Sequence, residues 1–269
     1  MNQPKILILR APGTNCDEET AYAFARAGGA PRSIHVNRLL AQPDVVTDYQ
    51  VLCIPGGFSY GDDVAAGKIF ANQICRHLAD AFAVFRDAGK LILGICNGFQ
   101  VLIKCGLLDT DDSQGPAATL AWNDSGRFID CWVRLHVHTD GPPCVYLEGI
   151  EQLYLPVAHA EGKFVTRDVA TLDRLQQAGQ LVLRYQPPGG DPRGHHGNPN
   201  GSMQDVAGMC DHTGRVFGLM PHPERHIDPT QHPSWTRRDL STDQTGPDPH
   251  DQAEGDGLQL FRNAVEYFR

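Results

Sequence analysis

The chain has 269 residues, of which 41% are hydrophobic and 20% are charged. This composition is typical of a globular protein and argues against disorder, and the length is sufficient for one sizeable α/β domain. The net charge of −9 argues against nucleic acid as a partner, because contacts to phosphate need clusters of Lys and Arg.

Apolar segments are too short for a signal-peptide core or for a membrane span, which needs about 18 consecutive apolar residues. The eight cysteines are irregularly spaced, and none forms a C-x-x-C pair. Several lie in apolar runs, where free cysteine behaves as a small hydrophobe. We therefore expect a reduced, cytoplasmic protein without a membrane partner.

The first half of the chain alternates between strand and helix patterns. Short apolar runs indicate strands, and apolar residues at helical spacing followed by glycine indicate helices. This alternation predicts a parallel sheet covered by helices on both faces. In chain order we expect a strand at 5–9, a helix at 16–29, a strand at 49–55, a helix at 69–88 and a strand at 90–95.

The second half of the chain is less regular. Its patterns predict strands at 126–138, 180–185 and 215–220, a long loop at 187–202 and an amphipathic helix at 257–268. Residues 228–256 are rich in Pro, Asp, Thr and His, which favours an insertion or a flexible loop. We expect a single domain over residues 1–269, with a doubly wound, mostly parallel sheet flanked by helices and an added antiparallel portion.

Polar or Gly-rich turns follow three of the predicted strands, as RAPGTNC, PGGFSYGDD and GICNG. Parallel strands end at the same edge of a sheet, and ligands bind at that edge. We therefore expect the chemistry of this protein there.

A cysteine lies between two glycines in GICNG. A nucleophile on a strand-to-helix turn needs strained backbone and small neighbours, and the start of a helix favours the thiolate. The backbone N–H of Asn97 would point towards a developing oxyanion. Cys96 is thus a candidate nucleophile, although a buried structural cysteine explains this stretch equally well.

A thiolate that performs acyl transfer needs a proton shuttle and a group that orients it. LMPHPER places His222 and Glu224 directly after a predicted strand. The intervening proline favours extended backbone, which would allow Glu224 to turn back towards the imidazole. Taken alone, this stretch is explained better by a surface loop. In the same way, the Pro-Gly-Gly turn of IPGGFSYGDD suits an oxyanion hole or simply a tight turn.

The three elements together, in this order and spacing, resemble the class I (triad) glutamine amidotransferases. The match is closer to the glutaminase part of phosphoribosylformylglycinamidine (FGAM) synthases, enzymes of purine biosynthesis. The blocks that carry the resemblance are PGTNCDEE, PGGFSYGDDVAAGKIFA, GICNGFQVL, NDSGRF, HAEGKF, NPNGS and GLMPHPER, and they extend from residue 12 to residue 225.

The resemblance implies a flavodoxin-like fold and a role for each matching position. Cys96 would be the nucleophile, His222 the base and acid, and Glu224 the group that orients it. Gly57 and Asn97 would supply the N–H groups of the oxyanion hole. The residues implied in glutamine binding are Gln100, Asn123, Ser125, Arg127 and Phe128.

The resemblance also implies a reaction and partners. L-Glutamine would be hydrolysed to glutamate and ammonia through a thioester. The ammonia would pass to a synthetase subunit that uses ATP and magnesium to convert formylglycinamide ribonucleotide (FGAR) to FGAM, and a small accessory subunit would complete the assembly. This chain itself would hold no cofactor.

Two positions depart from the family pattern. Ala160 stands in AHAEG where glycine is common, and residues 228–256 form a longer stretch than in short members of the family. Neither departure affects the three triad positions.

Other motifs suggest different functions. GDDVAAGKI (61–69) resembles a P-loop. However, five residues separate its first glycine from Gly-Lys, and isoleucine follows the lysine where a P-loop has Ser or Thr. We therefore expect no ATP site in this chain. Three histidine pairs have no cysteine or carboxylate at a spacing that would complete a metal site, so we expect no metal. The pairs are His136 and His138, His195 and His196, and His222 and His226.

Two further functions remain open. A non-catalytic relative could keep the fold and bind a partner, but it would have no need of all three triad residues. A cysteine hydrolase or chaperone on a related fold is disfavoured by the H-P-E order and by the blocks above.

Overall fold

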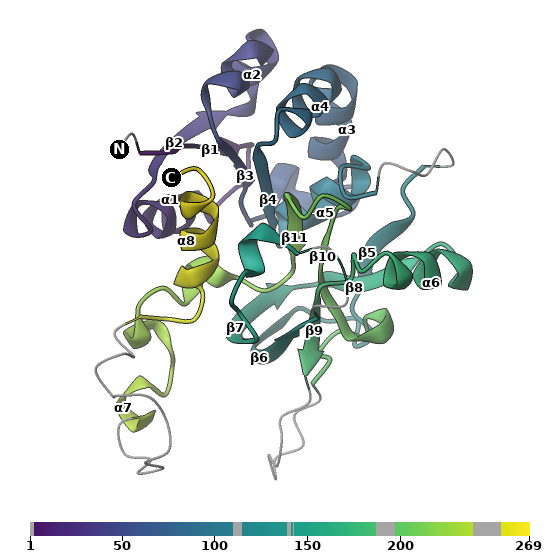
Figure 1. The fold of residues 1–269 in the computed structure, drawn as a ribbon. Coiled ribbons are helices and arrows are strands. Elements are labelled where there is room, and N and C mark those ends of the chain that lie inside the picture. The colour runs from purple at the N-terminus through teal and green to yellow at the C-terminus, as the bar shows by residue number, and fades with distance from the viewer. Residues whose placement is uncertain (1–2, 110–114, 139–140, 142, 187–196, 239–253) are drawn as a thin grey trace.

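The computed structural model describes residues 3–109, 115–138, 141, 143–186, 197–238 and 254–269. Its centre is a nine-stranded sheet whose strands follow the order β2-β1-β3-β4-β11-β10-β9-β6-β7 (Figure 1). Among the described residues, no helix is both long enough and apolar enough to cross a bilayer.

Five neighbouring strands form the parallel half of this sheet. The central strands are buried throughout and consist of apolar residues and glycine, as strands with helices on both faces require. This half confirms the predicted parallel sheet. It contains β2 (Ala30–His35), β1 (Lys5–Arg10), β3 (Val51–Ile54), β4 (Leu91–Ile95) and β11 (Val216–Leu219).

The other half of the sheet is the antiparallel portion. It contains β10 (Val206–Cys210), β9 (Leu183–Gln186), β6 (Ile129–Val137) and β7 (Gln152–His159). A separate antiparallel pair, β5 (Ala118–Trp122) with β8 (Glu161–Thr166), lies beside it. Only Ala160 separates β7 from β8, so this small pair lies directly beside the end of β7 in the large sheet.

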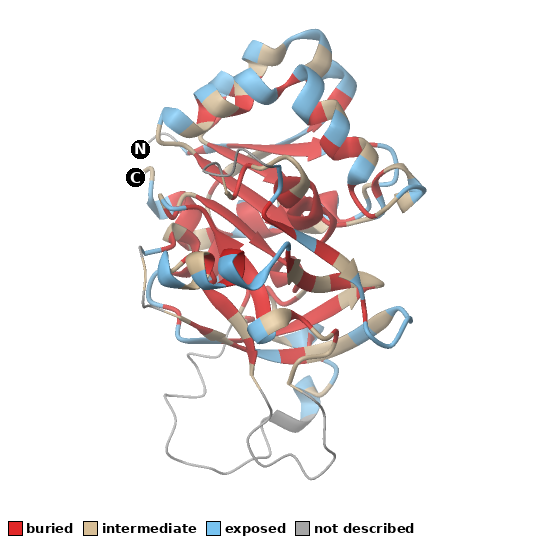
Figure 2. Cartoon of the chain, turned by 90° about the vertical axis from the view of Figure 1, so that its right-hand side faces the viewer, coloured by how far each residue is buried: buried red, intermediate tan, exposed pale blue. Residues whose placement is uncertain are grey.

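Helices cover the parallel half on both sides (Figure 1). α1 (Asp17–Arg26) packs on α8 (Leu258–Glu266), and α3 (Lys68–His77) packs on α5 (Asn97–Lys104). Figure 2 shows the buried strands at the centre and exposed residues on the outer helix surfaces. The remaining helices are α2 (Val36–Ala41), α4 (Ala79–Asp87), α6 (Val169–Gln177) and α7 (Trp235–Arg238).

The helix predicted at 69–88 is wrong as a single element, because the structure has two helices there, α3 and α4. Leu78 separates them with non-helical backbone (φ −126°, ψ 2°) and is fully buried. The chain thus changes direction around an apolar side chain. Helical spacing continues across the break, so the sequence pattern does not reveal it.

Part of the predicted insertion is ordered against the body of the protein. Residues 229–231 form a short 3₁₀ helix and α7 follows. The His232 ring lies 4.5 Å from the Trp132 ring and is buried. Residues 239–253 lie outside the described residues, as do 187–196 of the predicted loop, so the insertion stays a prediction.

Candidate active site

The site lies where β1, β3, β4 and β11 end, because these parallel neighbours have their carboxyl ends at one edge. The turns after β1 and β3 are joined by a bridge between Thr14 and Gly57. The turns after β4 and β11 are joined through the N–H of Cys96, which donates to the carbonyl of Leu219 at 2.8 Å. Residues far apart in sequence are thereby fixed around one point.

Cys96 occupies a strained turn between β4 and α5. Its backbone has φ 50° and ψ −103°, a conformation that costs a non-glycine residue roughly 1–3 kcal/mol. The residue is 5% exposed, and its Sγ lies 3.7 Å from the Ala158 carbonyl oxygen. The glycine that follows in GICNG has a steric cause, because a Cβ on Gly98 would overlap the Ile54 carbonyl of β3. The thiol is therefore held on a tight bend at the start of a helix, as the sequence predicted.

His222 and Glu224 form a buried pair beside this turn. His222 Nδ1 lies 2.6 Å from Glu224 Oε1, and the two residues are 2% and 0% exposed. The 3₁₀ turn Pro223–Arg225 folds the carboxylate back onto the ring, which is the geometry that we inferred from the proline. Nε2 has no hydrogen-bond partner among the described residues, and the Cys96 thiol lies close enough to the imidazole to affect its pKa.

Opposing effects act on the imidazole. Burial alone would lower the pKa of His222, but the Glu224 charge and then the Cys96 charge favour the imidazolium. The net result raises the pKa of His222 well above its ordinary value. The imidazole is thereby favoured in its protonated form, which can give a proton to a leaving group.

Glu224→Gln is expected to lower glutaminase turnover by roughly 10²- to 10⁴-fold, because a neutral amide neither stabilises the imidazolium nor fixes its tautomer. Steady-state glutamate release measures this effect. Glu19→Gln is the matched control, since Glu19 accepts from Arg225 at 3.2 Å on the partly exposed side of the same turn. Equal losses in both variants would contradict an orienting role for Glu224.

Cys16 is a buried neighbour of the triad that our sequence reasoning did not single out. Polar atoms of Cys16, His222 and Glu224 all lie within 4.8 Å of one another, the one such group among the described residues that could hold a metal. However, Arg225 donates to the Cys16 sulfur at 3.1 Å, and Glu224 already pairs with His222. A guanidinium in contact with the thiol disfavours a cation, so we retain the prediction of no metal.

A cavity of about 260 Å³ opens at Cys96. Gly57 and Gln100, which we predicted in the oxyanion hole and in substrate binding, lie on its wall. Gly57 has φ 138°, and a Cβ there would come within 2.8 Å of the Asn15 nitrogen. The other residues of the wall are Phe58, Gly61, Asp62, Ala66, Trp122, Ala158, His159, Ala160 and Glu161.

The side chain of Asn97 fastens the predicted oxyanion turn to the nucleophile. Its Oδ1 accepts from the N–H of Ser59 at 3.3 Å, and its Nδ2 donates to Asp62 Oδ1 at 3.1 Å and to Gln100 Oε1 at 2.9 Å. Gln100 in turn donates to the Glu161 carbonyl at 2.5 Å. Asn97 thus has a side-chain contribution besides the backbone N–H that we predicted.

The structure places the residues of 123–128 beside the cavity wall. Asn123 is buried and donates from Nδ2 to the Arg127 and His159 carbonyls, so its Oδ1 is an acceptor. His159 Nδ1 lies 3.1 Å from that oxygen and is therefore the protonated nitrogen. Ser125, Arg127 and Phe128 are exposed. Glutamine binding by these four residues stays a prediction.

His159, which sequence reasoning included only within the HAEGKF block, lines the cavity as a neutral imidazole. Burial, followed by the effect of His222, lowers its pKa to about 4. Only its contact with Asn123 could have drawn attention to it, and this contact is not visible in the sequence.

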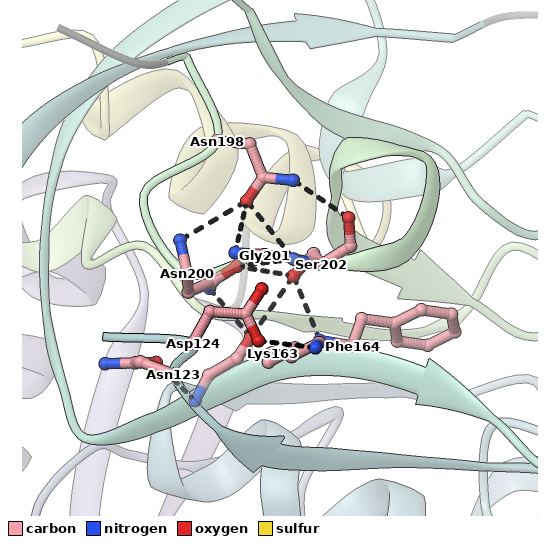
Figure 3. A network of polar contacts seen from close by, with 9 residues as sticks. Asn123, Asp124, Lys163, Phe164, Asn198, Asn200, Gly201 and Ser202 are labelled. Carbon is pink, nitrogen blue, oxygen red and sulfur yellow. Dashed lines mark hydrogen bonds and ion pairs between the residues drawn. The ribbon is translucent and has the colours of Figure 1, made fainter. Parts of the chain in front are cut away.

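A polar network fixes the 123–128 turn to the NPNGS loop (Figure 3). Asn198 Oδ1 accepts from the N–H groups of Gly201 and Ser202, at 2.9 and 3.2 Å. Ser202 Oγ accepts from the Phe164 N–H of β8 at 2.9 Å. The Asp124 N–H donates to the Asn200 carbonyl at 3.1 Å. The NPNGS loop therefore fixes the 123–128 turn and β8, which adjoin the cavity wall at Trp122 and Glu161.

The other motifs do not assemble into a second site. The His136 and His138 rings meet edge to face, with centroids 5.2 Å apart, but no third possible metal ligand joins them within the described part of the chain. His195 and His196 lie outside that part. The P-loop-like stretch leads into α3, and our expectation that it binds no ATP stays a prediction.

A doubly wound sheet with a cysteine on a strand-to-helix turn, next to a buried histidine–carboxylate pair, defines a class of protein built for acyl transfer. The chain belongs to the family described as CobB/CobQ-like glutamine amidotransferase domain, whose model matches residues 3–268. It is therefore a glutamine amidotransferase.

Individual relatives agree with this family. The chain is 42% identical over 269 residues to phosphoribosylformylglycinamidine synthase subunit PurQ of Dehalococcoides mccartyi, covering 100% of this chain and 99% of that protein. It is 38% identical to the subunit of that name from Archaeoglobus fulgidus, covering 98% and 96%. A chain in the structure of PurLQS from Thermotoga maritima matches with a TM-score of 0.71 and 31% identity, covering 100% of both chains.

Proposed function

We propose that this chain is the glutaminase subunit of an FGAM synthase. It hydrolyses L-glutamine to glutamate and ammonia and supplies the ammonia to a synthetase subunit. The observation that carries the chemistry is that Cys96, on the wall of a cavity, lies beside the buried His222–Glu224 pair. The full-length match to PurQ subunits supports the particular enzyme.

The first half of the reaction follows from the geometry. The Cys96 thiolate attacks the side-chain carboxamide carbon of glutamine. The tetrahedral oxyanion then rests on the backbone N–H groups of Gly57 and Asn97, and one such donor contributes roughly 3–4 kcal/mol in other enzymes. The His222 imidazolium gives its proton to the departing ammonia, which leaves a glutamyl thioester on Cys96.

The second half of the reaction reverses these roles. The now neutral His222 takes a proton from water, and the water oxygen attacks the thioester carbon. Collapse of the second oxyanion releases glutamate and restores the thiolate–imidazolium pair. Glu224 stays bonded to Nδ1 throughout and keeps Nε2 directed at the reaction.

The partner uses the ammonia in this proposal. A synthetase subunit holding ATP and magnesium converts FGAR to FGAM, a small accessory subunit completes the complex, and the whole assembly is cytoplasmic. Three exposed aromatic residues favour docking at the mouth of the cavity. Phe58 and Trp122 belong to its wall, and Phe128 lies beside Phe58 with ring centroids 6.4 Å apart.

Glutamate release by the purified chain is expected to be low alone and to rise at least tenfold with the synthetase and accessory subunits, because Phe58 belongs to the predicted oxyanion turn and docking can set that turn. The control is amidation of FGAR by the synthetase with free ammonia. High release from the chain alone would contradict the gating. No release in either state, with an active synthetase, would favour the non-catalytic alternative.

A further inference from the structure

Two cysteines outside the active site lie next to each other on neighbouring helices. Cys75 is in the last turns of α3, and Cys105 caps the end of α5. The Cys105 thiol lies 3.5 Å from the carbonyl oxygen of Ala71, which is one helical turn before Cys75. The Cys105 thiol thus lies on the turn of α3 that precedes Cys75, close to the Cys75 side chain, and both thiols are free.

The two thiols differ in exposure and in acidity. Cys75 is exposed and Cys105 is half-buried. The contact with Cys105 lowers the pKa of Cys75 to about 7; burial opposes this effect and the charge of Lys68 assists it. The same contact, together with burial, raises the pKa of Cys105 despite the charge of Lys104. Near neutral pH Cys75 is therefore in part an accessible thiolate, next to a protonated thiol.

We propose that Cys75 and Cys105 form a peroxide-reactive dithiol, a modification site separate from the glutaminase centre. The Cys75 thiolate attacks one oxygen of hydrogen peroxide and breaks the O–O bond, which gives a sulfenic acid and hydroxide. The Cys105 sulfur then attacks the Cys75 sulfur, so that a disulfide forms and water leaves. Two thiols and one peroxide thus become one disulfide and two waters, and a dithiol reductant reverses the change.

The dithiol is distant from Cys96, but helix α5 connects the two sites. Cys96 and Cys105 are nine positions apart, which is roughly 13 Å at the rise of an α-helix. At its other end, α5 contacts the start of α3, where a Cβ on Gly67 would lie 3.2 Å from the Val101 nitrogen and 3.3 Å from the Asn97 carbonyl oxygen. A disulfide would join the far ends of two helices whose near ends meet beside the nucleophile.

A second pair of neighbouring thiols provides an internal comparison. Cys144 and Cys210 also interact through their side chains, but both are buried, and burial raises the pKa of Cys144 well above its ordinary value. Proximity is therefore common to both pairs, whereas access and thiolate character belong to Cys75. Only the pair formed by Cys75 and Cys105 is expected to oxidise readily.

The test is oxidation of the full-length protein by a small molar excess of hydrogen peroxide, followed by alkylation and peptide mass spectrometry. We expect a Cys75–Cys105 disulfide to form first and to disappear after treatment with dithiothreitol. Oxidation of Cys96, or of the Cys144–Cys210 pair, at the same rate or earlier would overturn the proposal. So would irreversible oxidation of Cys75 without a disulfide.

Variants separate the two roles. Cys105→Ala should stop at a Cys75 sulfenic acid that dimedone traps, and Cys75→Ser should lose no thiol at the same dose. Cys131→Ser, in which a half-buried cysteine on β6 is replaced, should behave like the wild type. Alkylation of Cys75 should be half-maximal near pH 7 and should shift towards the ordinary pKa of 9.0 in Cys105→Ala. An unshifted midpoint would contradict the role of Cys105.

Discussion

Cys96→Ala is expected to abolish glutamine-dependent amidation of FGAR by the reconstituted complex, with a loss of roughly 10³-fold or more. Removal of a covalent nucleophile leaves only binding and oxyanion stabilisation, and the triad acts as a unit. The ammonia-dependent reaction of the same complex should be unchanged, because it bypasses the thioester. The measurement is the rate of FGAM formation with each nitrogen source.

The neighbouring thiol makes this experiment informative. Cys16 also lies against His222, but it contacts Asn15 Oδ1 at 3.3 Å and Arg225 at 3.1 Å, and burial raises its pKa. A neutral thiol held by these partners should not replace Cys96. The opposite result would be residual glutaminase activity in Cys96→Ala that disappears when Cys16→Ala is added. This result would show that Cys16 can replace Cys96. Cys131→Ala, in a half-buried position on β6, is the control for loss of a thiol.

Gly98→Ala is expected to cost roughly 1–3 kcal/mol or more of the free energy of unfolding and to remove glutaminase activity from the protein that still folds. The added Cβ would overlap the Ile54 carbonyl oxygen, which belongs to a buried central strand and cannot move cheaply. Relief of the overlap must therefore displace α5, and with it Cys96 and Asn97. Urea unfolding and glutamate release by the folded fraction measure the two effects.

Gly89→Ala is the matched control for this substitution. Gly89 has φ 76°, and a Cβ there would meet nothing within 4 Å. Its cost is limited to the left-handed backbone, about 1–2 kcal/mol, and activity should be retained. If Gly98→Ala lost no more stability than Gly89→Ala and kept its activity, close contact between α5 and β3 would not be what positions the nucleophile.

The parallel half of the fold could be predicted because its physical causes are local. Runs such as KILIL and KLILGI are apolar over the length of a strand, and the helices between them have apolar residues at helical spacing. The order of strands and turns then requires that the turns after β1, β3 and β4 lie at one edge. Cys96 could be placed on this edge for that reason.

Other elements could not be predicted because their stability comes from partners distant in the sequence. β2 has the sequence APRSIH, which is a poor strand pattern, but it pairs with β1 along its full length. The break at Leu78 depends on the core that receives its side chain. Arg127 is exposed in the structure, and the role in glutamine binding that the resemblance implies for it stays a prediction.

The sequence by itself determined the nucleophile candidate, the turn that carries it and the proline that folds Glu224 towards His222, because each depends on residues within a few positions of one another. Only the tertiary structure decided that Cys16 and Arg225 lie behind His222, that Asn123 fixes the tautomer of His159 and that Asn97 holds the oxyanion turn. The thiol pair of Cys75 and Cys105 is also a product of helix packing. These contacts join residues that are 34 to 209 positions apart. Their geometry is set by the packing of the whole sheet and its helices.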